Sequence, residues 1–150
     1  MKTTHLLRRA GAFPGLRTSV QTIVGTEWLV EAEECDPERL RDEALLRDIF
    51  QAIVEDLELK TIGEVWHKFP GEGGVTGLVA LTESHLACHT YPEDRTATFN
   101  LYCCRSRPEW PWKERLAEAL GSRLVTVSRI DRGGSVSDRV LIGGVAGGVR

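Results

Sequence analysis

A short segment in the middle of the chain holds most of the side chains that could do chemistry. Residues 82–93 read Thr-Glu-Ser-His-Leu-Ala-Cys-His-Thr-Tyr-Pro-Glu, so a serine, two histidines and a cysteine fall within six residues. A hydroxyl group beside an imidazole can act as a nucleophile with a base at hand. If residues 84–90 are extended, the two histidines share one face, and the other face carries Ser84, Cys88 and Thr90. The segment is therefore the first candidate for an active site.

A zinc site is the other chemistry that these side chains allow. Its ligands would be His85, His89 and a cysteine, but the chain has no Cys-x-x-Cys pair and no second ligand cluster. We therefore expect no metal. The cysteines also lack the density and spacing of a disulfide framework, so we expect reduced thiols at Cys35, Cys88, Cys103 and Cys104.

The composition fits one globular domain that acts on a small molecule. The chain has 150 residues, 41% hydrophobic and 27% charged, which is enough for one core of useful size. Its formal net charge of -3 argues against a general nucleic-acid binder. No run approaches the roughly 20 apolar residues that span a bilayer, and the first residues lack the apolar core of a secretion signal. We expect a cytoplasmic protein that binds a charged small molecule and neither nucleic acid nor membrane.

Alternation and helical spacing predict where the strands and helices lie. Residues 27–33 alternate between apolar residues and glutamates, which is typical of a half-buried strand. Asp36-Pro37 suits the start of a helix, and apolar residues then recur at helical spacing over 45–54. A second helix is predicted over 112–120, where Gly121 suits the C-cap. Further strands are predicted over 62–69, 78–81, 85–90, 96–102, 123–130 and 136–142.

Strands that follow one another through short turns, with only two intervening helices, predict an α+β fold. We expect a two-layer sandwich, with a mainly antiparallel sheet and two main helices on one face, over residues 27–143. Residues 1–26 contain basic residues and glycine and proline breaks but no acidic residue, which predicts a flexible extension. A basic targeting peptide is the alternative there. The last residues, 144–150, are predicted to form a flexible tail.

The central segment resembles the self-cleavage segment of the prokaryotic S-adenosylmethionine decarboxylases, which depend on a pyruvoyl group. The residues that carry the likeness are Glu83-Ser84-His85-Leu86, with His89-Thr90 and Pro92-Glu93 after them. The resemblance covers residues 27–131. Further matches are Ala32 to Pro37, His67-Lys68-Phe69, Gly74-Val75-Thr76-Gly77, and Cys104 at the catalytic cysteine's spacing from the serine.

The resemblance implies that the chain makes its own cofactor. The Ser84 oxygen would attack the carbonyl of Glu83 and convert the peptide bond to an ester, and elimination and hydrolysis would then leave a pyruvoyl group at position 84. Self-cleavage would thus fall between Glu83 and Ser84. The family pattern gives His89 the role of base, and Thr76, which replaces a serine, the role of donor to the developing oxyanion.

The resemblance also implies the reaction. The pyruvoyl carbonyl would form a Schiff base with the substrate's amine and take up electrons as carbon dioxide leaves, in a step of polyamine synthesis. Cys104 matches the acid that returns a proton to the α-carbon. Phe69 matches an aromatic residue that stacks on adenine, and further candidates for substrate binding are Glu93, His67 and Asp94. Family members form dimers with sites at or near the subunit boundary, so we expect a homodimer of processed chains.

Several departures from the family pattern lie close to the substrate. The family usually has Trp-Pro-Glu-Tyr-Gly-Tyr-Ala after the histidine, whereas residues 91–97 read Tyr-Pro-Glu-Asp-Arg-Thr-Ala. One extra residue lies between Phe69 and Gly77, and Arg105 stands where glycine is usual. The serine chemistry is unaffected by these changes, but the pocket for the adenosyl group is altered.

Two alternatives follow from these departures. Asp94 could pair with a guanidinium or ammonium group, and Arg95 could repel a sulfonium, which favours a pyruvoyl-dependent arginine or ornithine decarboxylase. A protein of another class, an unprocessed regulatory paralogue, is the second alternative. An inactive partner would have no chemical need for the residues of self-cleavage and catalysis. The presence of all four therefore weighs against an unprocessed paralogue: Glu83, Ser84, His89 and Cys104.

Overall fold

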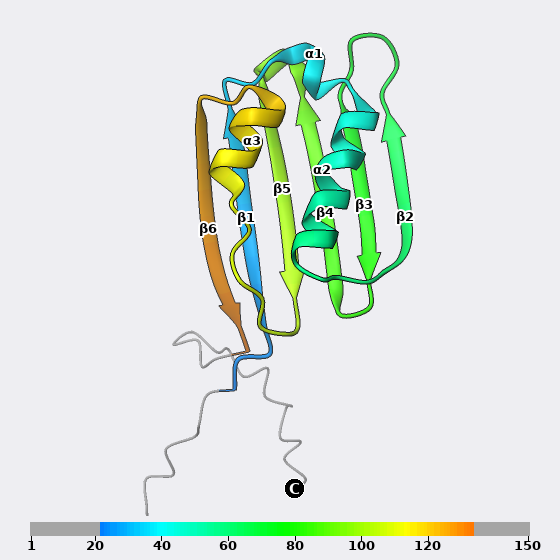
Figure 1. The fold of residues 1–150 in the computed structure, drawn as a ribbon. Helices are drawn as coiled ribbons and strands as arrows, with labels where there is room; N and C mark the ends of the chain where they lie inside the picture. Colours follow the sequence, from blue (N-terminus) through cyan, green and yellow to red (C-terminus); the bar gives the residue numbers. More distant parts are fainter. Residues whose placement is uncertain (1–21, 134–150) are drawn as a thin grey trace, which may run out of the picture.

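The chain folds into an antiparallel sheet that carries its helices on a single face (Figure 1). The computed structural model describes residues 22–133. The sheet order is β2-β3-β4-β5-β1-β6, and each neighbouring pair is antiparallel. Along the chain the elements are β1 (Gly25–Glu33), α1 (Pro37–Leu40), α2 (Glu43–Asp56), β2 (Thr61–Lys68), β3 (Val75–Leu81), β4 (Ser84–Tyr91), the 3-10 turn η1 (Pro92–Asp94), β5 (Thr96–Cys103), α3 (Trp112–Leu120) and β6 (Leu124–Arg132). The predicted two-layer α+β architecture is confirmed. None of the described helices is long and apolar enough to cross a membrane.

The core lies between the sheet and the helical layer. Residues of β1 alternate between the two faces, and the buried ones include Trp28, Val30 and Ala32. Helix α2 buries one stripe, made of Leu46, Ile49, Phe50 and Ile53. Helix α3 buries a second stripe, made of Trp112, Leu116 and Leu120. Because each large apolar side chain that leaves water contributes about 1.5–3 kcal/mol, these stripes decide which face of the sheet the helices cover.

The helical segment after β1 differs from the single helix that the sequence predicts. Asp36 caps α1 as expected, with its carboxylate accepting a hydrogen bond from the Glu38 N–H (3.0 Å), but α1 ends at Leu40. Asp42 then has an extended backbone and caps α2 by accepting from the Leu45 N–H (3.1 Å). Because this second aspartate offers a second cap, the chain starts a new helix instead of continuing the first.

The other predicted elements occur with shifted ends. β1 starts two residues before the predicted position 27, and β3 starts at Val75, three residues before position 78. Helix α3 covers the predicted residues 112–120. The strand predicted over 136–142 and the tail predicted over 144–150 lie outside the described residues, as does most of the predicted extension over 1–26.

The face of the sheet opposite the helices is called the open face here, because no described helix covers it (Figure 1). Large apolar side chains are exposed on it, including Leu29 (39% exposed), Val65 (68%) and Leu78 (45%). His89 also lies on this face, since it alternates along β4 with the buried residues Cys88 and Thr90. The predicted division of the segment into two faces is thus confirmed.

A buried hydroxyl group ties the helical layer to the sheet. Thr90, in β4, is 6% exposed. Its Oγ1 donates to the carbonyl oxygen of Leu40 (2.7 Å) and accepts from the N–H of Val75 (2.8 Å). Thr90 therefore connects α1, β3 and β4 at one end of the sheet.

Thr90→Val should destabilise the fold by about 2–4 kcal/mol, because it leaves a buried carbonyl and a buried N–H without partners while keeping the side-chain shape. Urea unfolding followed by tryptophan fluorescence measures the change. Thr126→Val, on the exposed face of β6, is the control and should change the free energy of unfolding by less than about 0.5 kcal/mol. Equal effects of the two substitutions would contradict a structural role for the Thr90 hydroxyl.

Candidate active site

Glu83 and Ser84 lie at a tight turn between two strands. β3 ends at Leu81, Thr82 and Glu83 form the turn, and β4 begins at Ser84. Ser84 pairs with Leu81 across the turn and with Cys103 of β5 on its other side. The Glu83–Ser84 peptide bond is therefore at the end of the sheet, next to the end of β5.

The residues that follow β5 hold Glu83 at three points. The N–H of Cys104 donates to the carbonyl oxygen of Glu83 (3.1 Å). The Glu83 carboxylate pairs with Arg105 (Nε to Oε1, 2.8 Å) and with Arg107 (Nη2 to Oε2, 3.8 Å). A donor is therefore already in place on the carbonyl group where a nucleophilic attack by Ser84 would create an oxyanion.

The hydroxyl group of Ser84 faces Cys103, while the side chain of Cys104 is directed elsewhere. Ser84 Oγ donates to Cys103 Sγ at 3.9 Å. Cys103 is buried, and this burial raises the pKa of its thiol, which therefore stays protonated at neutral pH. Cys104 is exposed. Its thiol lies near the phenol of Tyr102, whose pKa is raised by burial and, to a smaller extent, by Cys104.

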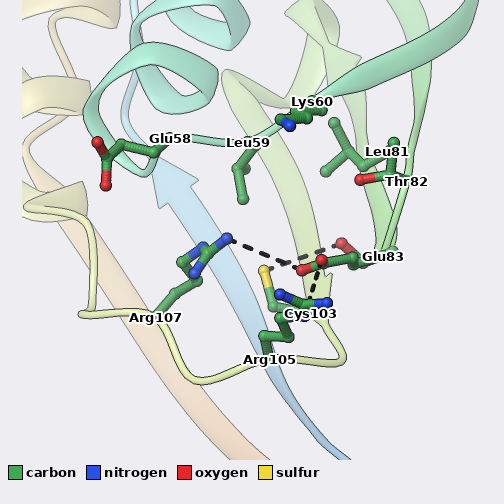
Figure 2. Close-up of a pocket in the computed structure, with 10 residues that line it drawn as sticks. Glu58, Leu59, Lys60, Leu81, Thr82, Glu83, Cys103, Arg105 and Arg107 are labelled. Atoms are coloured by element: carbon green, nitrogen blue, oxygen red, sulfur yellow. Dashed lines mark hydrogen bonds and ion pairs between the residues drawn. The ribbon is translucent and has the colours of Figure 1, made fainter.

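A cavity of about 380 Å³ opens beside the turn (Figure 2). Its size is that of a small-molecule site. Figure 2 shows Glu83 and Arg107 directed toward each other across the cavity, with Cys103 between them and Leu59 above. The lining residues are Glu58, Leu59, Lys60, Leu81, Thr82, Glu83, Ser84, Cys103, Arg105 and Arg107.

A second group of predicted residues lies at the other end of β3 and β4. Thr76 and His89 are register partners, and Thr76 Oγ1 is 3.0 Å from His89 Nδ1. Both line a second cavity, of about 350 Å³, together with Phe69 and Glu93. The ring of His67 packs edge-on against Phe69, with 4.6 Å between the ring centroids. Phe69, Thr76, His89 and Glu93 thus form one site, with His67 against its aromatic wall.

The two groups do not meet within one chain. Ser84 and His89 are five positions apart on β4, and at roughly 3.3 Å per residue this is a separation of about 16 Å. Their side chains also point to opposite faces of the sheet. The structure brings Ser84 to Cys103, Glu83 to Cys104, and Thr76 to His89, but it does not bring His89 to Ser84.

His85 takes part in a chain of hydrogen bonds on the open face. Its Nε2 is 3.0 Å from Asn100 Oδ1, and Asn100 Nδ2 donates to Glu27 Oε1 (2.7 Å). Arg132 donates to the other oxygen of Glu27 (2.6 Å). Both hydrogen bonds lower the pKa of the Glu27 carboxylate, and the one from Asn100 has the larger effect.

Within residues 22–133, no group of three or more histidine, cysteine, aspartate or glutamate side chains is arranged to hold a metal ion.

Two residues of the predicted substrate loop line neither cavity. Asp94 is exposed at the end of η1, and its backbone carbonyl accepts a hydrogen bond from Thr96 (3.0 Å). Arg95 has a left-handed backbone (φ 53°), and its Nε donates to the carbonyl of Cys35 (2.9 Å). The side chains that could select a basic amino acid or repel a sulfonium are therefore absent from the lining of both cavities.

Several groups at these sites could not be found from residue types and spacing. The donor to the Glu83 carbonyl is a backbone N–H, which every residue except proline possesses. Arg107 reaches the turn only because the chain folds back after β5. Asn100 bonds to Glu27 from 73 positions away. These contacts depend on strand pairing between distant parts of the chain, which residue types and spacing alone do not predict.

Comparison with known proteins shows which family the chain resembles. The family model described as S-adenosylmethionine decarboxylase matches residues 26–133. The S-adenosylmethionine decarboxylase proenzyme of Thermococcus gammatolerans is 36% identical over 120 residues, which cover 77% of this chain and 80% of that protein. The proenzyme of the same name from Pseudomonas aeruginosa is 31% identical over 123 residues, covering 81% and 76%.

A solved structure supports the fold. The adenosylmethionine decarboxylase from Aquifex aeolicus superimposes with a TM-score of 0.63 and 22% sequence identity, over 79% of this chain and 98% of that one. The family model covers nearly all of the described residues, from β1 to the end of β6. The chain belongs to the S-adenosylmethionine decarboxylase family.

Proposed function

We propose that the chain is a proenzyme that cleaves itself between Glu83 and Ser84 and then decarboxylates S-adenosylmethionine. The observation that carries this proposal is the hydrogen bond from the Cys104 N–H to the Glu83 carbonyl (3.1 Å). It polarises the carbon that Ser84 must attack and is already in place for the oxyanion. Cys104 also lies at the family's spacing from the serine, so the backbone and the side chain of one residue would serve successive steps.

Self-cleavage requires only water besides the protein. The Ser84 oxygen bonds to the Glu83 carbonyl carbon while the C–N bond breaks, and the hydroxyl proton moves to the freed nitrogen. Loss of the α-proton of Ser84 then breaks the Cβ–O bond and releases Glu83 as a carboxylate. Water converts the remaining unsaturated residue to a pyruvoyl group and ammonia. A base is needed twice in this sequence, once for each proton.

The residues around position 84 fit a pyruvoyl group and the proton transfers that it requires. When such a group is present, it supplies an electron sink for the loss of carbon dioxide. The exposed thiol of Cys104 would return a proton to the substrate carbon. The buried thiol of Cys103 faces Ser84 and would shape the cavity without exchanging protons with solvent.

Thr76 and His89 fit the same reaction when a second copy of the chain supplies them. In a two-fold dimer, each surface patch of one chain contacts its complement on the other, so the Ser84 end of β4 can meet the His89 end of the partner. The Ser84 hydroxyl faces Cys103 in the single chain, so the proposal requires it to turn toward the open face in the dimer. The apolar side chains of Leu29, Val65 and Leu78 give the open face area that a partner can bury. We therefore propose a homodimer through the open face, with two composite sites.

Phe69 and Glu93 support S-adenosylmethionine as the substrate. Both line the second cavity, and the Phe69 side chain is 47% exposed, so its ring is open to a ligand. An aromatic ring can stack on adenine, and a carboxylate attracts the positively charged sulfonium. In the proposed dimer this cavity lies next to position 84 of the partner, where the reacting carbon would be.

Wild-type protein should cleave itself into fragments of 83 and 67 residues, the second of which should carry a carbonyl group. Ser84→Ala should stay intact because it lacks the attacking oxygen. Thr82→Ala, which removes the other hydroxyl of the turn, is the control and should still cleave. Intact mass spectrometry with hydrazine labelling measures these outcomes, and a wild-type chain that stays whole and unlabelled after long incubation contradicts the proposal.

Cys104→Ala should lower the rate of carbon dioxide release per processed chain about 100-fold or more, because general acid catalysis typically contributes about 10²–10⁴-fold. Its self-cleavage should continue because the backbone N–H remains. Cys103→Ala is the matched control, and it should affect cleavage more than turnover, since its thiol contacts Ser84. If Cys104→Ala turns over at the wild-type rate, the assignment of the proton donor is wrong.

A mixture of two cleavage-deficient variants tests whether His89 acts across the dimer. His89→Ala keeps Ser84, and Ser84→Ala keeps His89, so each chain lacks what the other provides. His89→Ala alone should cleave slowly. When it is refolded together with Ser84→Ala, its cleavage should recover in the mixed dimers.

The two chains can be told apart by mass, and the rate of His89→Ala cleavage is the measurement. Refolding with a Ser84→Ala, His89→Ala double variant is the control, because that chain supplies no imidazole at position 89. Cleavage that is equally slow in both mixtures would show that His89 does not act from the partner.

A further inference from the structure

The cavity beside Ser84 carries more positive than negative charge. Its lining includes the cations Lys60, Arg105 and Arg107 and the carboxylates Glu58 and Glu83 (Figure 2). Arg105 and Arg107 each pair with Glu83, one on each carboxylate oxygen. Neither arginine has a part in the chemistry described so far.

The strand register places the turn, and contacts of Glu83 add to it. The described non-glycine residues with positive φ are Glu34, Glu58 and Arg95, so neither Thr82 nor Glu83 has a left-handed backbone. Residue 83 is held by further contacts. These come from residues 104–107, as one N–H on the carbonyl and two guanidinium groups on the carboxylate.

Arg107 is less exposed to water than Arg105, although its pair with Glu83 is longer (3.8 Å compared with 2.8 Å). The Arg107 side chain is 27% exposed, compared with 73% for Arg105, and exposed ion pairs are screened by water. The Nε atom of Arg107 is buried and has no hydrogen-bond partner among the described residues. Of its other nitrogens, Nη1 donates to the carbonyl oxygen of Ser106 (3.4 Å) and Nη2 pairs with Glu83.

We propose that Arg107, assisted by Arg105, is a positioning residue for self-cleavage. The pairing of the Glu83 carboxylate keeps the carbonyl of the same residue on the Cys104 N–H, where Ser84 can attack it. This inference rests on the proposed self-cleavage and assigns it a further residue. Arg107 contacts neither the attacking oxygen nor the carbonyl, so it acts through Glu83.

The charge of the two arginines also suits the course of the reaction. Negative charge first develops on the carbonyl oxygen of Glu83 as the Ser84 oxygen adds to it. The two guanidinium groups beside Glu83 favour this charge.

The test is the rate constant of self-cleavage in full-length chains, followed from the intact precursor by mass spectrometry. Arg107→Gln should slow cleavage about tenfold or more, because a small misplacement of reacting groups costs at least this much. Arg107→Lys, which keeps the charge, should recover part of the rate. Arg115→Gln is the matched control, since Arg115 forms a similar half-exposed pair with Asp56 (3.0 Å) away from the turn, and it should leave the rate unchanged.

Hydroxylamine and a double variant separate positioning from general stability. Hydroxylamine cleaves the chain at an accumulated ester, so a defect in the first acyl shift is not rescued by it, and Arg107→Gln should stay slow in its presence. A variant with both Glu83→Gln and Arg107→Gln should be slowed less than the product of the two single effects.

Wild-type cleavage combined with an unimpaired Arg107→Gln would overturn the inference and leave the proposed function standing. Rescue of Arg107→Gln by hydroxylamine, or simple multiplication of the two single effects, would overturn it as well. A wild-type chain that never cleaves would overturn the proposed function and the inference together.

Discussion

The pairing of β4 with β5 is the interaction on which the candidate site depends. It places Ser84 opposite Cys103, so that the next residue, Cys104, meets the carbonyl of Glu83. A shift of the pairing by one residue would turn each side chain of β4 to the other face of the sheet. The register is fixed by burial, since the inward side chains of both strands lie in the core: Leu86, Cys88 and Thr90 from β4, and Phe99, Leu101 and Cys103 from β5. The position of the reacting groups at the turn is therefore a consequence of core packing along the whole length of the two strands.

The same strand also sets a limit on what one chain can do. A straight β4 keeps its two ends apart, and alternation turns Ser84 and His89 to different faces. Thr76 and His89 are held together by strand register and by their hydrogen bond, so this pair forms without help from the other end. In the proposed dimer, a second copy on the open face would bring the His89 end of one chain to the Ser84 end of the other, and the Ser84 hydroxyl would turn from Cys103 toward that face. Dimerisation through the open face would explain both the exposed apolar residues on that face and the separation of the candidate residues between the two ends of β4.

The sequence predicted the fold class, both main helices and the two faces of β4, because these follow from local periodicity and burial. It did not predict the break between α1 and α2, where Asp42 competes as a second cap, or the full length of β3. The segment around Ser84 could be recognised from its motif. The cations around Glu83 could not, because Arg107 comes near the turn only through the path of the chain after β5. The family resemblance singled out Cys104, but only the structure shows that its backbone contacts the Glu83 carbonyl while Cys103 contacts the Ser84 hydroxyl.

The proposed activity can be measured as the release of carbon dioxide from S-adenosylmethionine by the processed protein, compared with release from arginine and ornithine under the same conditions. We expect S-adenosylmethionine to be decarboxylated at a rate that follows the fraction of cleaved chains, and the two amino acids to be poor substrates. The exposed position of Asp94 and the attachment of Arg95 to the Cys35 carbonyl agree with this preference. Release of carbon dioxide from arginine or ornithine, with none from S-adenosylmethionine, would show that the protein is not an S-adenosylmethionine decarboxylase.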